Sequence, residues 1–204
     1  MLTIVDYGMG NIRSVRNAIT YLGSDVRVSS DPVDIVGSSK LILPGVGSFR
    51  RAIENIHGRN LFTALQEAVR RRGVPVLGIC LGMQLLASSG DEDGPTNGLG
   101  WIDGRVVRLK FDNPSVRIPH IGFNDVKAAA SGSSVFGHLT EPSDFYFVHS
   151  YHLVCATRSD VAAWSDYNGP FVAAVEKDNI FGMQFHPEKS QANGLALLGK
   201  FISL

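Results

Sequence analysis

The chain has 204 residues, of which 44% are hydrophobic and 19% charged, and its formal net charge at pH 7 is +0. This composition is typical of an ordinary globular protein, and the length fits one domain, residues 1–204, with a core of two or three layers. A neutral balance argues against nucleic-acid binding through bulk charge, and no apolar run approaches the ~20 residues of a membrane span. We therefore expect neither nucleic acid nor membrane as a partner.

The first half of the chain alternates apolar strands with amphipathic helices. A strand at residues 2–5 precedes a helix whose apolar side chains recur at helical spacing, namely Ile12, Val15, Ile19 and Leu22. A second helix is expected at 61–69. Further strands are expected at 26–28, 40–43 and 74–79. Repeated strand–helix order with continuous apolar strands favours a parallel sheet covered on both faces.

After about residue 98 the pattern changes to hairpins. Residues 98–107 are typical of two strands joined by an Asp103-Gly104 turn. Two further turns, at 168–170 and 178–179, separate strands that we expect to extend the same sheet, before a final helix. The predicted fold class is therefore α/β, with a mostly parallel central sheet flanked by helices and antiparallel strands added in the C-terminal half.

The most informative segment is residues 78–82, Gly-Ile-Cys-Leu-Gly, which follows the predicted strand 74–79 directly. A glycine on each side of a single reactive residue is the pattern of a nucleophile elbow, here with sulfur in place of a serine hydroxyl. We expect a helix to follow, with Met83, Leu86 and Ala87 on it. At the start of that helix the N–H groups and the helix dipole favour thiolate over thiol. The alternative is a buried cysteine between two structural glycines.

A cysteine nucleophile needs a base close in space, usually a histidine, and a third group that fixes the tautomer of that histidine. His186 ends the predicted strand 181–185, at the carboxyl edge of the sheet where sites of α/β proteins lie. Glu188 follows within reach of its imidazole. The sequence therefore predicts Cys80, His186 and Glu188 as a catalytic triad. The alternative is that this His-Pro-Glu segment only ends a strand.

An acyl transfer also needs donors for the developing oxyanion. The glycine-containing loop 44–47 follows a strand expected beside the elbow, so its backbone N–H groups, that of Gly47 included, can supply one donor. The N–H of Leu81, directly after the nucleophile, would supply the second donor. The alternative is a glycine turn without catalytic duty.

The other cysteine and the other histidines have less specific surroundings. His57 and His138 lie in polar, glycine-containing stretches, so we expect them at the surface, whereas Cys155 is expected in the core of a buried strand. The two cysteines are far apart and predict neither a disulfide nor a zinc site, and no histidine spacing predicts a metal site. Low cysteine content and the lack of a signal peptide predict a cytoplasmic protein.

The segments 78–84 and 185–190 together resemble the class I glutamine amidotransferases. Within that family the chain is similar to the HisH type, the glutaminase subunits of imidazole glycerol phosphate synthase. The resemblance covers the full length, because the expected segments follow in order at 6–11, 43–47, 98–100, 119–122 and 147–151.

This resemblance implies a reaction and a set of roles. Cys80 would attack the side-chain amide of glutamine, His186 would pass a proton to the departing ammonia, and Glu188 would orient His186. The backbone N–H groups of Gly47 and Leu81 would form the oxyanion hole. The residues implied in holding the glutamine substrate are Gln84, Glu92, His149, Ser150 and Tyr151.

The resemblance also implies a partner. Ammonia would pass, protected from water, to a (β/α)₈-barrel cyclase bound as a heterodimer. This cyclase makes imidazole glycerol phosphate and the by-product aminoimidazole carboxamide ribotide in histidine biosynthesis. Isolation matters because protonated ammonia is no longer a nucleophile. No cofactor is expected, since neither a dinucleotide fingerprint nor a Walker A loop is present.

Two positions depart from the usual family pattern, and alternatives therefore stay open. Phe123 stands where tryptophan is usual, and His152 where tyrosine is commoner. They could mark a paralogous glutaminase subunit that supplies ammonia to another synthase, such as an enzyme amidating a surface-polysaccharide sugar. A stand-alone hydrolase of γ-glutamyl compounds and a non-catalytic scaffold subunit are further alternatives; the scaffold is disfavoured because the cysteine, histidine and glutamate are all present.

Overall fold

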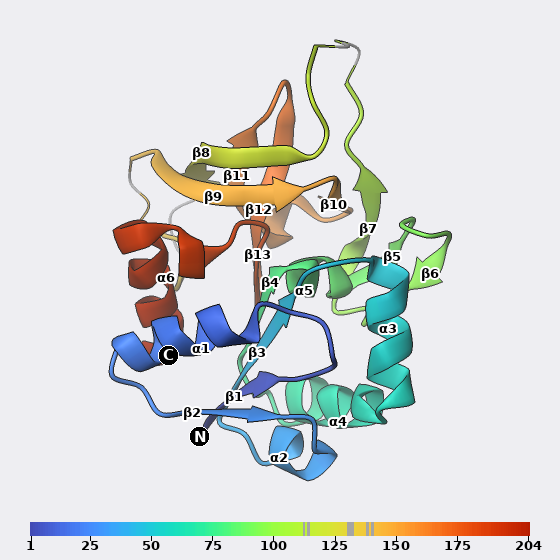
Figure 1. Cartoon of the computed structure of the whole chain (residues 1–204), viewed down its shortest axis with the longest axis vertical. Helices are drawn as coiled ribbons and strands as arrows, with labels where there is room; N and C mark the ends of the chain where they lie inside the picture. The colour runs from blue at the N-terminus through green and yellow to red at the C-terminus, as the bar shows by residue number, and fades with distance from the viewer. Residues whose placement is uncertain (112, 114, 130–132, 138, 140) are drawn as a thin grey trace.

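A computed structural model describes residues 1–111, 113, 115–129, 133–137, 139 and 141–204 (Figure 1). The surface position expected for His138 therefore lies outside the described residues, whereas His57 is exposed as expected. Within the described chain no helix is both long enough and apolar enough to cross a membrane.

A nine-stranded sheet forms the middle of the molecule, in the order β2-β1-β3-β4-β13-β12-β11-β8-β9. The first five of these strands are parallel: β2 (Val26–Ser29), β1 (Leu2–Val5), β3 (Lys40–Gly45), β4 (Val76–Cys80) and β13 (Ile180–Met183). The other four continue the sheet antiparallel: β12 (Pro170–Lys177), β11 (Val161–Asp166), β8 (His120–Ala128) and β9 (Ser143–His149). The predicted fold class is confirmed.

Helices cover both faces of the parallel part (Figure 1). On one face lie α1 (Ile12–Tyr21) and α6 (Gln191–Ser203). On the other face lie α2 (Pro32–Val36), α3 (Phe49–Gly58) and α4 (Leu61–Gln66). The last of these helices continues into a short π-helix at Glu67–Arg71. Neighbouring strand residues accordingly belong to different cores, because side chains alternate across a strand. Ile4 packs in the α1/α6 core, whereas Val5 packs in the core below α2, α3 and α4.

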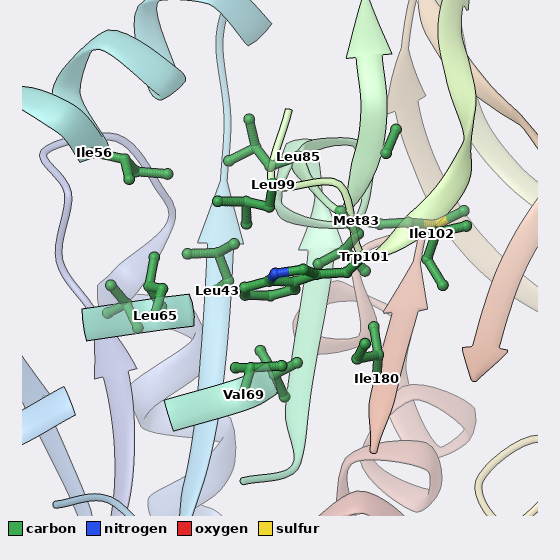
Figure 2. Close-up of a cluster of buried hydrophobic side chains, with 14 of the residues drawn as sticks. Leu43, Ile56, Leu65, Val69, Met83, Leu85, Leu99, Trp101, Ile102 and Ile180 are labelled. Carbon is green, nitrogen blue, oxygen red and sulfur yellow. The ribbon is translucent and has the colours of Figure 1, made fainter. Parts of the chain in front are cut away.

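The larger of the two cores is centred on Trp101 (Figure 2). Its ring lies among aliphatic side chains from several elements, including Leu43 of β3 and Val69 beyond α4. The indole Nε1–H donates to Gln66 Oε1 over 3.0 Å, and Gln66 in turn donates to the carbonyl of Leu99 over 2.9 Å. The buried polar edge of the indole is thereby satisfied, so this core tolerates a tryptophan.

A second, four-stranded sheet corrects two predictions. Its order is β10-β7-β5-β6, with β10 at Tyr151–Cys155, β7 at Ile102–Arg108, β5 at Ala87–Gly90 and β6 at Thr96–Asn97. Asp103 and Gly104 lie inside β7 and form no turn, so the hairpin expected at 98–107 is wrong. Gly104 sits in the strand because β10 passes so closely that a Cβ there would overlap the carbonyl of Val154.

The helix after the elbow, α5 (Leu81–Leu85), is also shorter than expected, because Ala87 already begins β5. The helix ends early because the residues after it pair with a neighbouring strand: Ala87 and Gly90 pair in parallel with β7. The other two turns are confirmed. The left-handed residues Asn168 and Gly169 join β11 to β12, and Asp178 joins β12 to β13.

Candidate active site

Cys80 lies at the carboxyl end of β4, where the chain turns directly into α5. Its φ of 55° and ψ of −110° are strained for a residue with a side chain. The flanking glycines make this turn possible. A Cβ on Gly78 would lie 2.6 Å from the backbone of Gly82, and a Cβ on Gly82 would overlap the carbonyl oxygen of Leu43 on the neighbouring β3. The segment therefore has the geometry of a nucleophile elbow.

A cavity of about 540 Å³ opens beside Cys80. Every residue that the sequence analysis placed in the oxyanion hole or the substrate site lies on its wall: Gly47, Leu81, Gln84, Glu92, His149, Ser150 and Tyr151. Further wall residues, which the sequence analysis did not single out, are Val46, Ser48, Asp93, Pro119 and Val148. Cys80 itself is only 6% exposed, so a reacting group reaches it through this cavity.

His186 and Glu188 do not line the cavity and form a buried pair. His186 Nδ1 and Glu188 Oε1 are 2.7 Å apart, with the side chains 1% and 0% exposed. Asn11, which the sequence analysis did not single out, donates to the same Glu188 oxygen over 3.1 Å. The backbone of His186 is fixed by Ser190, whose hydroxyl donates to its carbonyl over 2.7 Å. The imidazole is therefore held through Nδ1, and the backbone that carries it is fixed by Ser190.

His186 lies near Cys80, because β13, which leads to His186, pairs in parallel with β4, which ends at Cys80. Burial lowers the pKa of His186, but the neighbouring Cys80 and Glu188 outweigh burial and raise the pKa to about 10. The second ring nitrogen, Nε2, is buried and has no hydrogen-bond partner among the described residues. Nε2 is therefore available to the nucleophile or a leaving group.

Glu92 connects the cavity wall to α3. Its Oε2 accepts from the backbone N–H of Phe49, the first residue of α3, over 2.9 Å. Burial raises the pKa of Glu92, as does the neighbouring charge of Asp93, while the bond from Phe49 lowers it. The carboxylate is held in place by one oxygen, which leaves the other to accept from a ligand.

Gln184 is a further residue that the sequence analysis did not single out. Its fully buried side chain lies between Cys80 and Gln84, with Nε2 3.7 Å from Cys80 Sγ and Oε1 3.0 Å from Gln84 Nε2. The one signal in the sequence was its spacing of two residues from His186.

A pair of neutral histidines supports the part of the cavity wall that His149 forms. His120 Nδ1 and His149 Nε2 are 3.0 Å apart, and His149 Nδ1 donates to the carbonyl of Tyr151 over 2.9 Å. Burial lowers the pKa of His120 to about 4 and that of His149 to about 3. The rings of Tyr167 and Phe147 stack on His120 at 4.0 and 4.8 Å. These two histidines are therefore uncharged at neutral pH.

Protein stability is expected to fall between pH 6.5 and pH 4 because of this pair. A histidine in the unfolded chain binds a proton near pH 6.5, whereas folded His120 does so only near pH 4, so stability rises with pH across this window. In His120→Phe the free energy of unfolding should depend less steeply on pH there, as measured by urea unfolding at several pH values. Equal slopes for variant and wild type would contradict this assignment.

The two departures from the family pattern lie away from the Cys80 cavity wall. Phe123 is 48% exposed on β8 and packs edge-on against Tyr146, with ring centroids 5.6 Å apart. His152 is half-buried on β10, beside Phe171, and burial lowers its pKa. Cys155 is half-buried rather than fully buried, a correction to its expected core position, because it borders a surface cavity between β10 and β12.

The chain belongs to the class-I glutamine amidotransferase family, whose model matches residues 3–203. It is 44% identical over 202 residues to the imidazole glycerol phosphate synthase subunit HisH 2 of Methanococcus maripaludis, covering 99% of this chain and 98% of that relative. It is also 41% identical over 206 residues to subunit HisH of Leptospira interrogans, with both chains fully covered.

Solved structures of low sequence identity share the fold. One described as a glutamine amidotransferase has a TM-score of 0.76 at 17% identity, covering 98% of this chain and 97% of that one. The glutaminase domain of Trypanosoma brucei CTPS, solved with bound acivicin, has a TM-score of 0.66 at 16% identity, covering 99% and 93%.

Proposed function

We propose that this chain is the glutaminase subunit of an imidazole glycerol phosphate synthase, hydrolysing glutamine to glutamate and delivering ammonia to a partner. The observation that carries the proposal is Cys80, held at a strained elbow on a cavity, beside the strand that leads to the buried His186–Glu188 pair. The full-length similarity to HisH subunits favours histidine biosynthesis over amidation of a polysaccharide sugar as the use of the ammonia.

In the proposed reaction, the thiolate of Cys80 attacks the carbonyl carbon of the glutamine side-chain amide. Backbone N–H groups of Gly47 and Leu81 stabilise the oxyanion of the tetrahedral intermediate. His186 gives its proton to the amide nitrogen, and the C–N bond breaks. Ammonia departs, and the acyl group stays bound to Cys80 as a thioester. His186 then takes a proton from water, which attacks the thioester and releases glutamate. Glu188 keeps the imidazole in the required orientation throughout.

The cavity is suited to the rest of the glutamine molecule. In the proposal the free carboxylate oxygen of Glu92 accepts from the α-ammonium group, and Gln84 and the segment His149–Tyr151 bind the remaining polar atoms. A volume of about 540 Å³ falls in the range of small-molecule sites.

The proposal includes a partner, a domain arrangement and a location. Residues 1–204 act as one glutaminase domain, which binds a (β/α)₈-barrel cyclase as a heterodimer and passes ammonia to it. The two HisH relatives are named as subunits, which supports a partner enzyme. We place the protein in the cytoplasm, since Cys80 has to remain a free thiol to react.

Acivicin, a glutamine-analogue electrophile, tests the nucleophile directly. The expected result is one covalent adduct on the peptide that contains Cys80, with Cys155 unlabelled, because only Cys80 faces the cavity and is coupled to a histidine. Cys155 serves as control within the same molecule, since burial and the charge of Asp160 raise the pKa of its thiol to about 12. Equal labelling of both cysteines, or labelling of Cys155 alone, would refute the assignment; glutamine should protect Cys80.

A further inference from the structure

Gln184 occupies a position that the proposed reaction does not yet use. It is wholly buried, directly after the last residue of β13, and its backbone N–H donates to the carbonyl of Ala173 over 2.8 Å. Its side chain bridges two residues of the candidate site, Cys80 and Gln84. A buried primary amide is retained in a core only when its hydrogen bonds are made, so the direction of these bonds carries information.

The carbonyl of Tyr151 fixes that direction. This oxygen can only accept, and Gln84 Nε2 lies 2.9 Å from it, so the NH₂ end of Gln84 faces Tyr151. The same NH₂ group lies 3.0 Å from Gln184, so the atom of Gln184 on that side must accept and is Oε1. The opposite end of the Gln184 amide, which faces Cys80 Sγ at 3.7 Å, is therefore the NH₂ group, a donor.

The histidine pair is consistent with the same direction. His149 donates to the same Tyr151 oxygen through Nδ1, so its Nε2 accepts from His120 Nδ1. His120 Nε2 then faces the side-chain nitrogen of Asn124 at 3.4 Å, a donor. With these orientations every hydrogen bond around the Tyr151 oxygen pairs a donor with an acceptor. The opposite orientation of Gln184 would place its NH₂ group against the NH₂ group of Gln84.

We propose that Gln184 is a positioning residue, which donates a hydrogen bond to the Cys80 sulfur and ties the nucleophile to the substrate-facing Gln84. A donor aimed at sulfur favours the thiolate over the thiol, because the thiolate is the stronger acceptor. It also fixes the sulfur beside the cavity, since Gln184 is itself held by Gln84 and by the backbone of Ala173. This inference rests on the role proposed for Cys80.

Gln184→Met tests the inference, because methionine has similar length and flexibility but no donor. The measurement is the rate of alkylation of Cys80 by iodoacetamide as a function of pH, with the rate at Cys155 recorded in the same samples. We expect the rate at Cys80 at neutral pH to fall about 10-fold or more while the rate at Cys155 is unchanged, as for loss of a charge-assisted hydrogen bond. Glutaminase kcat should fall by a similar factor.

Ser165→Ala is the matched control. Ser165 is also buried, its hydroxyl has no hydrogen-bond partner among the described residues, and it does not line the Cys80 cavity. In Ser165→Ala the pH profile of Cys80 alkylation should coincide with that of the wild type. If Gln184→Met also gives the wild-type profile, Gln184 only fills space and the inference is overturned. If Cys80 of the wild type is unreactive at every pH, the proposed function itself fails.

If Gln184→Met does not fold, a second measurement tests the same hydrogen bond in the wild-type protein. In protein labelled with ¹⁵N-glutamine, the side-chain NH₂ signal of Gln184 should move with pH in parallel with the reactivity of Cys80. That movement should disappear in Cys80→Ala. A Gln184 signal that is insensitive to pH in the wild type, or that still moves in Cys80→Ala, would overturn the hydrogen bond to sulfur.

Discussion

Cys80→Ala is expected to abolish glutamate release, with kcat lowered by about 10³-fold or more, since no other described residue of the cavity wall is a comparable nucleophile. Alanine at this position keeps the small volume required between Gly78 and Gly82. The variant should therefore fold and bind its partner as the wild type does. Glutamate formation from glutamine by the partner-bound protein is the measurement.

Cys155→Ala is the control for this result. Cys155 borders a different cavity, on β10, so its replacement should leave glutamate release within about 2-fold of the wild type. If Cys80→Ala kept the wild-type rate while Cys155→Ala lost it, the nucleophile would have been assigned to the wrong sulfur. If Cys80→Ala failed to bind the partner, the loss would instead report a damaged fold, which thermal unfolding would reveal.

Gly82→Ala is expected to have the largest effect on stability. The new methyl group would overlap the carbonyl oxygen of Leu43, so β3 and α5 would have to separate where they support the elbow. Neither group is a flexible side chain that can move aside. We expect the free energy of unfolding to fall by about 3 kcal/mol or more. Thermal unfolding followed by circular dichroism measures this loss.

Gly199→Ala provides the matched control. Gly199 lies inside α6, and among the described residues a methyl group added there would meet no atom from outside the helix backbone within 4 Å. Alanine should therefore stabilise the helix by about 0.5–1 kcal/mol. The same substitution is therefore expected to lower the free energy of unfolding at Gly82 and to raise it at Gly199. An unfolding temperature of Gly82→Ala equal to that of Gly199→Ala would show that the elbow does not need close packing of β4 and α5 against β3.

The elbow and the parallel strands could be predicted because their signals are local. Continuous apolar strands such as 2–5 and 76–80 suit only a sheet buried on both faces, and the glycines around Cys80 stand within one short segment. The Asp103-Gly104 hairpin was wrong for the complementary reason. A glycine can serve a tight turn or the close approach of a neighbouring strand, and only the position of β10 decides between them.

The contacts that complete the candidate site could not be predicted, because they join residues far apart in the sequence. Asn11 meets Glu188 across 177 positions, and Gln184 meets Cys80 across 104. Neither residue type is diagnostic of catalysis, and neither stands in a pattern that requires it. The second sheet escaped prediction for the same physical reason, since the pairing of β7 with β5 and β10 depends on tertiary packing rather than on local propensity.

The most direct test of the account is to trap the covalent intermediate. Partner-bound protein mixed with ¹⁴C-glutamine and quenched in acid within one turnover should carry label on the Cys80 peptide, released by hydroxylamine as expected of a thioester. Cys80→Ala should carry none. Steady release of glutamate with no label on Cys80, or with label on another residue, would contradict the role of this sulfur.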